Sequence, residues 1–147
     1  LVECMRKALG LAEIVKLGEG ELRFLEDRGI DLRSFGLKLI AVTKGEKGSE
    51  LIHEGLRIEA PAERVKAIDP TGAGDAYMAA LLAGLYALGK LRDLKLDEDE
   101  LRLIGRFANI VAGISTTRRG AWSVPRISML RDREELKSIV ERLEARS

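Results

Sequence analysis

Cysteine, histidine, tryptophan and proline are all scarce in this sequence of 147 residues. It contains one cysteine, one histidine, one tryptophan and three prolines. A single cysteine excludes an intrachain disulfide and fits a reducing compartment. We predict that Cys4 belongs to the core, because it lies in an apolar helical pattern. The lone His53 is predicted to be a surface or partly buried residue of a strand rather than a catalytic group.

Long apolar runs and an excess of one charge are also absent. No run of about 18 apolar residues exists, which argues against a membrane-spanning helix, and no basic segment followed by an apolar one opens the chain as in a signal peptide. The 25 basic and 24 acidic residues leave a formal net charge of +1, so no general attraction to nucleic acid or anionic membrane is expected. We therefore predict a cytoplasmic protein that binds neither nucleic acid nor membranes.

Helical and strand patterns alternate along the chain, and 46% hydrophobic with 33% charged residues is typical of a globular protein. Apolar β-rich runs predict strands over 12–17 and 37–45, with two or three short strands within 46–68. Apolar spacing, together with glycine or acidic residues at the ends, predicts helices over 1–9, 19–29, 72–88, 97–117 and 131–146. The alternation predicts an α/β fold with a largely parallel sheet, in one domain or one half of a larger one. The chain begins at Leu1 in mid-pattern, which leaves open a fragment of a longer protein or a trimmed terminus.

The segment Asp69–Leu82, DPTGAGDAYMAALL, combines a glycine-rich turn with the start of an apolar helix. A helix N-terminus presents unpaired N–H groups, and glycine lets an anion approach them closely. Asp75, in the first helical turn, can accept a proton from a hydroxyl group that attacks phosphorus. The pattern alone leaves a second interpretation open, in which Asp75 only caps the helix. Neither G-x-x-x-x-G-K-[ST] nor G-x-G-x-x-G is present, which disfavours a P-loop ATPase and a Rossmann dehydrogenase.

DPTGAGDAYMAALLAGL resembles the signature D-T-x-G-A-G-D of the ribokinase-like (PfkB) carbohydrate kinases, which a helix follows. Further segments resemble motifs of the family and follow the family's order along the chain. EIVKLGEGEL resembles its K-x-N-x-x-E strand, and LIAVTKGEKGSEL resembles its V-T-x-G-x-x-G turn. FANIVAGISTTRRGAWSVP resembles its late helix and the loop after it. The resemblance implies a Rossmann-like three-layer α/β sandwich, of which residues 1–147 are the C-terminal, nucleotide-binding and catalytic part. It also implies transfer of the γ-phosphate of ATP to the hydroxyl group of a small sugar.

The resemblance further implies roles for individual residues. Asp75 matches the catalytic base, beside an anion hole formed by Gly72, Ala73 and Gly74. The positions that match the nucleotide site are Glu21, Thr43, Gly45, Glu46, Lys47, Gly48 and Asn109. ATP chemistry implies Mg²⁺, with Glu21 in its network largely through water. Some members also bind a monovalent cation, such as K⁺, and the matching positions here are Asp69, Thr71, Ser115, Arg118, Gly120 and Ser123.

The sequence departs from the family at Gly18, where the usual residue is an asparagine that contacts phosphate or bound water. Three functions therefore stay open: a sugar kinase closest to the fructokinases, a nucleotide-binding or regulatory module without turnover, and a non-kinase α/β scaffold. In the family, the sugar-contacting residues and the lid come from an N-terminal half, which is absent from this chain. We expect the chain alone to bind ATP weakly and not to phosphorylate sugar. An exposed sheet edge further predicts a homo-oligomer, and Trp122 is expected to pack against the last helix.

Overall fold

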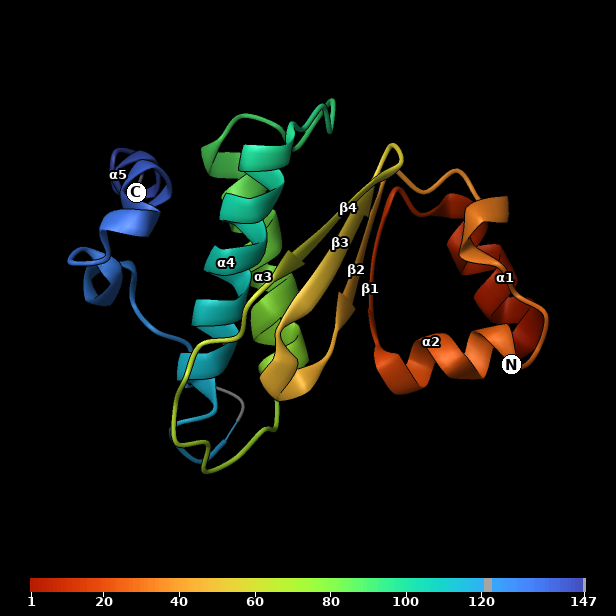
Figure 1. The fold of residues 1–147 in the computed structure, drawn as a ribbon, viewed down its shortest axis with the longest axis horizontal. Coiled ribbons are helices and arrows are strands. Elements are labelled where there is room, and N and C mark those ends of the chain that lie inside the picture. Colours follow the sequence, from red (N-terminus) through yellow and green to blue (C-terminus); the bar gives the residue numbers. More distant parts are fainter. Residues whose placement is uncertain (121–122, 147) are drawn as a thin grey trace.

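The computed structural model describes residues 1–120 and 123–146, which are arranged around a four-stranded sheet (Figure 1). The strands lie side by side in chain order: β1 (Ile14–Gly18), β2 (Leu39–Thr43), β3 (Ser49–His53) and β4 (Leu56–Ala60). Only β1 and β2 run parallel, whereas β2, β3 and β4 form antiparallel pairs. The prediction of a largely parallel sheet is therefore wrong. Glu54 and Gly55 both have positive φ, at 46° and 86°, as in a two-residue hairpin turn, which joins only antiparallel strands.

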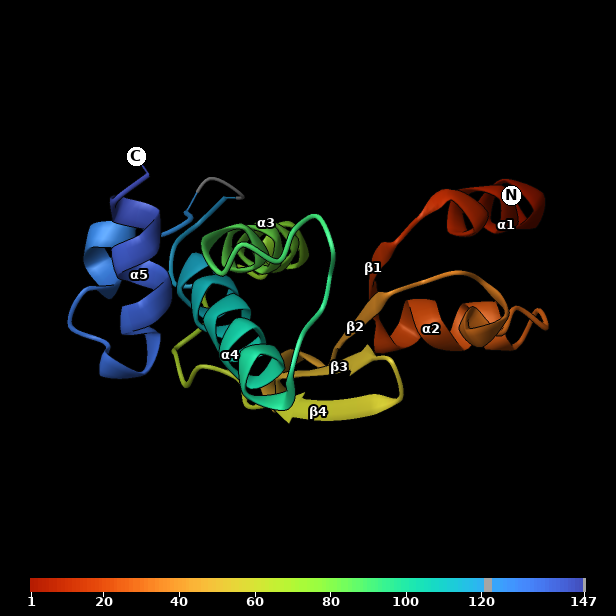
Figure 2. The same ribbon diagram turned by 90° about the horizontal axis from the view of Figure 1, so that it is seen from above.

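Helices cover both faces of the sheet (Figures 1 and 2). One face carries α1 (Val2–Leu11) and α2 (Glu19–Glu26), and the other carries α3 (Ala73–Ala87) and α4 (Glu98–Ser115). Helix α5 (Lys137–Glu144) packs outside α3. Short 3₁₀ turns complete the chain at Leu32–Ser34, Gly45–Lys47, Ile127–Leu130 and Glu134–Leu136. This layering agrees with the predicted three-layer α/β sandwich.

Strand β2 divides the interior into two apolar clusters, because successive side chains of a strand point to opposite faces. Leu39 and Ala41 pack in the larger cluster with the helices α3, α4 and α5, while Ile40 and Val42 pack in the smaller one beside α1 and α2. The strand is buried on both sides, which explains its continuous apolar run. In the described ranges, no helix is both long and apolar enough to cross a membrane.

Helix α4 lies unusually close to the sheet. A Cβ added to Gly105 would lie 2.6 Å from Leu51 Cδ1 and 2.8 Å from Ala60 Cβ. The helix begins at a capping box, in which the Asp97 side chain accepts from the Glu100 N–H and the Glu100 side chain accepts from the Asp97 N–H. This close packing fixes the second half of α4 above the end of β4.

The predictions for Cys4, for His53 and for the start of the C-terminal helix differ from the structure. Cys4 is exposed, because the packed side of α1 is formed by Val2, Met5 and Leu9. His53 is only 2% exposed. Its Nδ1 donates to the carbonyl of Lys38 at 2.7 Å, and its Nε2 accepts from the N–H of Leu96 at 3.4 Å.

The C-terminal helix begins at Lys137 instead of 131, because Arg133 has an extended backbone (φ −91°, ψ 95°) and interrupts the helical pattern. The prediction for Trp122 lies outside the described residues.

Candidate functional site

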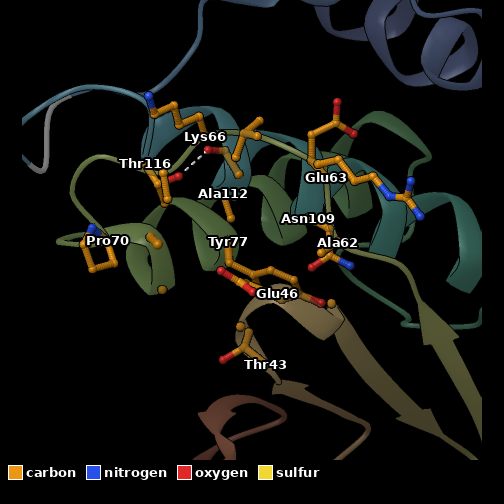
Figure 3. A pocket seen from close by; sticks show the side chains of 18 of the residues that line it. Thr43, Glu46, Ala62, Glu63, Lys66, Pro70, Tyr77, Asn109, Ala112 and Thr116 are labelled. Atoms are coloured by element: carbon orange, nitrogen blue, oxygen red, sulfur yellow. Dashed lines mark hydrogen bonds between the residues drawn. The ribbon is translucent and has the colours of Figure 1, made fainter.

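A cavity of about 920 Å³ lies between the turn after β2, the start of α3, the second half of α4 and the extended segment 61–72. Figure 3 shows Thr43 and Glu46 on one side of this space and Lys66, Ala112 and Thr116 on the opposite side. The volume falls within the range of small-molecule and cofactor sites. Of the predicted site residues, the cavity lining includes Thr43, Gly45, Glu46, Gly48, Ala73, Gly74 and Asn109.

The turn after β2 requires glycine at two places. Gly45 and Gly48 have φ values of 58° and 100°, which are left-handed conformations that glycine adopts without strain. A Cβ on Gly48 would also collide with the carbonyl oxygen of Ala60 and lie 2.7 Å from the amide nitrogen of Ala62. The turn therefore sits directly on the end of β4 and carries Glu46 to the cavity. Lys47, on the same turn, is exposed and lies outside the cavity lining.

A buried polar cluster joins α3, α4 and the sheet at the base of the cavity. The hydroxyl of Tyr77 donates to Ser49 Oγ at 2.8 Å, and Asn109 Nδ2 donates to Ser49 Oγ at 3.1 Å and to the carbonyl of Ala60 at 2.9 Å. Burial raises the pKa of Tyr77 to about 12, although the bond to Ser49 acts in the opposite direction. Because a carbonyl only accepts, the amide nitrogen of Asn109 must face Ala60. Its Oδ1 remains as an acceptor for a ligand.

The start of α3 has the properties of an anion site. Gly72 caps the helix in a left-handed conformation with φ 81°, and Ala73 N–H donates back to the carbonyl of Pro70 at 3.1 Å. Within the described ranges, the N–H groups of Gly74 and Asp75 donate to no acceptor. The positive end of the helix dipole adds to these free donors. Asp75 is exposed in the first turn, next to this site but outside the cavity lining.

Lys16 of β1 adds a positive charge to the same place; the sequence placed it in the K-x-N-x-x-E strand but gave it no role of its own. A Cβ on Gly74 would lie 2.7 Å from Lys16 Nζ, so the ammonium group reaches the start of α3. No carboxylate in the described part of the chain pairs with it. The sequence indicates the direction of this side chain, because Lys16 lies between Val15 and Leu17. Successive side chains of a strand alternate, so Lys16 points to the face of β1 opposite to these two apolar residues.

Glu21 is used locally as a helix cap. Its Oε2 accepts from the N–H of Gly18 at 2.6 Å, and Gly18 is paired with Thr43 across β1 and β2. This arrangement places Glu21 at the edge of the sheet where both parallel strands end. No three His, Cys, Asp or Glu side chains converge in the described ranges. A magnesium ion here would take most of its oxygen ligands from phosphate and water, as Mg²⁺ usually does in nucleotide sites.

Asp69 ties the loop before α3 to the loop after α4. Its Oδ1 accepts from Thr71 N–H and its Oδ2 from Gly120 N–H, both at 3.0 Å, while the carbonyl of Thr116 accepts from the N–H groups of Ile68 and Asp69 at 2.7 and 3.0 Å. The side-chain hydrogen bond from Thr71 and the backbone bonds lower the pKa of Asp69 to about 2.

Three of the six predicted cation positions are thus in direct contact. Ser115 instead bonds within its own helix, to Ala112 at 2.7 Å, and Ser123 Oγ donates to the carbonyl of Arg119 at 3.4 Å. Arg118 is exposed.

Comparison with known proteins is consistent with this geometry. The family model described as pfkB family carbohydrate kinase matches residues 2–126. An uncharacterized sugar kinase from Pyrococcus horikoshii, solved in complex with ATP, is 40% identical with a TM-score of 0.79, over 94% of this chain and 42% of that chain. A double mutant of Vibrio cholerae fructokinase, solved with fructose, ADP and potassium ion, is 31% identical with a TM-score of 0.73, over 88% of this chain and 43% of that chain.

A curated relative gives the same result at the sequence level. The fructokinase of Escherichia coli is 35% identical, with 92% of this chain and 43% of the relative covered. The chain therefore spans about two fifths of the length of the relatives that it matches. The solved structures confirm the ribokinase-like α/β fold.

Proposed function

The chain belongs to the pfkB family of carbohydrate kinases, and from this we propose that it supplies the nucleotide site and the catalytic base of an ATP-dependent sugar kinase. One observation carries the proposal: the free N–H groups of Gly74 and Asp75, together with the Lys16 ammonium, surround the start of α3 at the edge of a nucleotide-sized cavity. We assign residues 1–147 to the C-terminal part of the kinase domain. The sugar-contacting residues and the lid then belong to an N-terminal part.

The proposed reaction is an in-line transfer of the γ-phosphoryl group. A sugar hydroxyl forms a bond to the γ-phosphorus while the bond from that phosphorus to the β,γ-bridging oxygen breaks, and ADP leaves. Asp75 accepts the hydroxyl proton. The free amides of Gly74 and Asp75, together with Lys16, stabilise the negative charge on the transferred group, because these donors are fixed before the reaction begins. Mg²⁺ would supply charge neutralisation on the phosphates, and Glu21 is the carboxylate that would hold it through water.

We assign the rest of the nucleotide to the cavity. The turn formed by Thr43, Gly45, Glu46, Lys47 and Gly48 would lie along it, and Asn109 Oδ1 would accept a hydrogen bond from the amino group of adenine. The contacts between Asp69 and Gly120 support a K⁺ site between these two loops, with further oxygens from Thr71, Ser115, Arg118 and Ser123. Fructose is the first acceptor to test, since fructokinases are among the relatives.

A second function, nucleotide binding without turnover, is favoured by one observation. Gly18 leaves the space beside Glu21 and Thr43 without a polar side chain: a Cβ there would lie 3.6 Å from Glu21 Oε2 and 3.9 Å from Thr43 Oγ1. A polar contact to phosphate is therefore missing from this corner. In this case the cavity would bind ATP as a regulatory ligand.

Replacing Asp75 with asparagine in the full-length protein tests both functions. The substitution removes the base but keeps the size of the side chain, so we expect kcat for the best sugar of a panel to fall at least about 100-fold while the Kd for ATP changes little. Asp132→Asn, an exposed carboxylate of the C-terminal segment, is the control and should keep full activity. Unchanged turnover in the Asp75 variant would disprove the assignment of the base. ATP binding without turnover of any sugar by the unaltered protein would favour the regulatory function.

A further inference from the structure

The wall of the cavity contains a carboxylate that is held between two arginines. Glu63 lies in the extended segment 61–72, and its side chain is only 12% exposed. Arg106 Nη2 donates to Glu63 Oε2 at 2.7 Å, and Arg133 Nη2 donates to Glu63 Oε1 at 2.6 Å. Burial alone would raise the pKa of Glu63, but the hydrogen bonds from Arg133 and Arg106 outweigh it and lower the pKa below its usual value. The carboxylate is therefore charged and both of its oxygens are used.

Helix α4 also holds the backbone of this segment. Arg106 Nη1 lies 3.4 Å from the carbonyl oxygen of Pro61 and 3.3 Å from that of Ala62. A Cβ on Gly113 would lie 2.8 Å from the Cβ of Glu63, so the helix and the segment are in direct contact. Ala62 and the residues that follow it line the cavity. The position of this wall thus depends on the contacts that hold Glu63.

The second arginine comes from a part of the chain that the family model does not cover. The family match ends at residue 126, whereas Arg133 lies between two 3₁₀ turns of the C-terminal segment. That segment is fixed in the larger core by Leu136, Ile139 and Val140, which are 0–3% exposed. Glu135 also pairs with Arg106 at 3.2 Å and with Arg133 at 3.8 Å. Two arginines and two glutamates therefore connect the cavity wall, α4 and the C-terminal segment.

We propose that Glu63 and Arg133 are positioning residues for the nucleotide, through which the C-terminal segment fixes the wall of the cavity. The ion pair does not touch the reacting atoms: in Figure 3 the carboxylate of Glu63 is turned away from Glu46 and Tyr77, toward the C-terminal helices. Loss of the pair should therefore weaken nucleotide binding and leave the transfer step unchanged. The proposal rests on the proposed function, because it requires that the cavity bind a nucleotide.

The test compares two arginines of the same segment in the full-length protein. Arg133→Ala breaks the contact to the cavity wall, and Arg131→Ala breaks a pair with Glu144 at 2.5 Å, which involves no residue of the cavity lining. The probe is a fluorescent ATP analogue that carries a methylanthraniloyl group on the ribose. For Arg133→Ala we expect its Kd and the KM for ATP to rise about fivefold or more, as is typical of energetic coupling between sites, with kcat unchanged.

Three further measurements separate positioning from general damage. Arg133→Lys keeps the charge and should recover part of the affinity, and Glu63→Gln should weaken binding as Arg133→Ala does. Without nucleotide, hydrogen exchange in residues 61–68 should be faster in Arg133→Ala than in Arg131→Ala. An unchanged Kd in Arg133→Ala, or an equal rise in Arg131→Ala, would overturn the proposal. If the unaltered protein bound no nucleotide, the proposed function itself would fail. If the unaltered protein bound nucleotide normally and neither variant altered the Kd, only the positioning role of Glu63 and Arg133 would fail.

Discussion

The carboxylate of Asp69 shows how one residue can make the site dependent on pH. Its folded pKa of about 2 lies below the ordinary value of 3.8, so the ionised form is favoured by folding. A lowered pKa contributes stability that is present above the unfolded value and is lost as the pH falls toward the folded value. The contribution of Asp69 to stability is therefore complete at pH 5 and disappears between about pH 4 and pH 2.

Asp69→Asn tests this dependence directly. An asparagine keeps one acceptor oxygen but turns an amino group toward one of the two N–H donors of Thr71 and Gly120, so we expect lower stability than the unaltered protein at pH 5. The difference in urea midpoint between the two proteins should shrink as the pH falls to 2. Asp132→Asn serves as the matched control. A difference that stays constant over this range would show that the charge of Asp69 plays no part.

At the scale of elements, the close approach of α4 to the sheet depends on the absence of a side chain at Gly105. Gly105→Ala would place a methyl group against Leu51 and Ala60, and overpacking of this kind costs about 1–3 kcal/mol of unfolding free energy. Gly10→Ala in α1 is the control, because nothing lies within 4 Å of the added Cβ, and alanine there should stabilise the helix by up to about 1 kcal/mol. Urea unfolding of both variants measures the effect. Equal stability of the two would show that the sheet yields to the methyl group.

The elements themselves could be predicted from the sequence, because their periodicity is local. The buried run of β2, the apolar helix α3 and the acidic start of α4 all carry their own signals. The largely parallel sheet was predicted incorrectly, since the antiparallel hairpin of β3 and β4 contains a glutamate with positive φ at position 54, a conformation that is uncommon for this residue. The extended backbone of Arg133 likewise delays the start of the last helix to Lys137, and the side chain of Arg133 is held by Glu63, 70 residues away.

The site was predictable where a motif is contiguous. DPTGAGD and TKGEKG led to Gly74 and to the turn at Gly48, which the structure places beside one cavity. Tyr77 and Glu63 could not be found in this way, because their roles arise from contacts across 28 and 70 residues of chain. Their sequence neighbours are ordinary helix and loop residues.

For the molecule as a whole, one unpaired edge of the sheet is the outer edge of β1. This strand has β2 as its one neighbour in the described part of the chain, and its five residues are all half-buried. An unpaired edge is a template for another strand. We expect the 147-residue chain to associate in a concentration-dependent way, which sedimentation velocity at several concentrations would detect. A single monomeric species at all concentrations up to about 100 μM would contradict the expected association. Exposed strand edges cause association in a concentration range that includes this value.

The turn at Gly48 also determines how mutations in the codon of this residue affect the protein. Every single-base change of a glycine codon that alters the amino acid, apart from those that create a stop, adds at least a Cβ. Here that atom meets the main chain of Ala60 and Ala62 instead of a movable side chain. No such change can be accommodated by a rotamer, so each one must displace the end of β4 and the wall that follows it. At position 48 even the smallest such change, glycine to alanine, therefore reaches the cavity without altering any residue's charge.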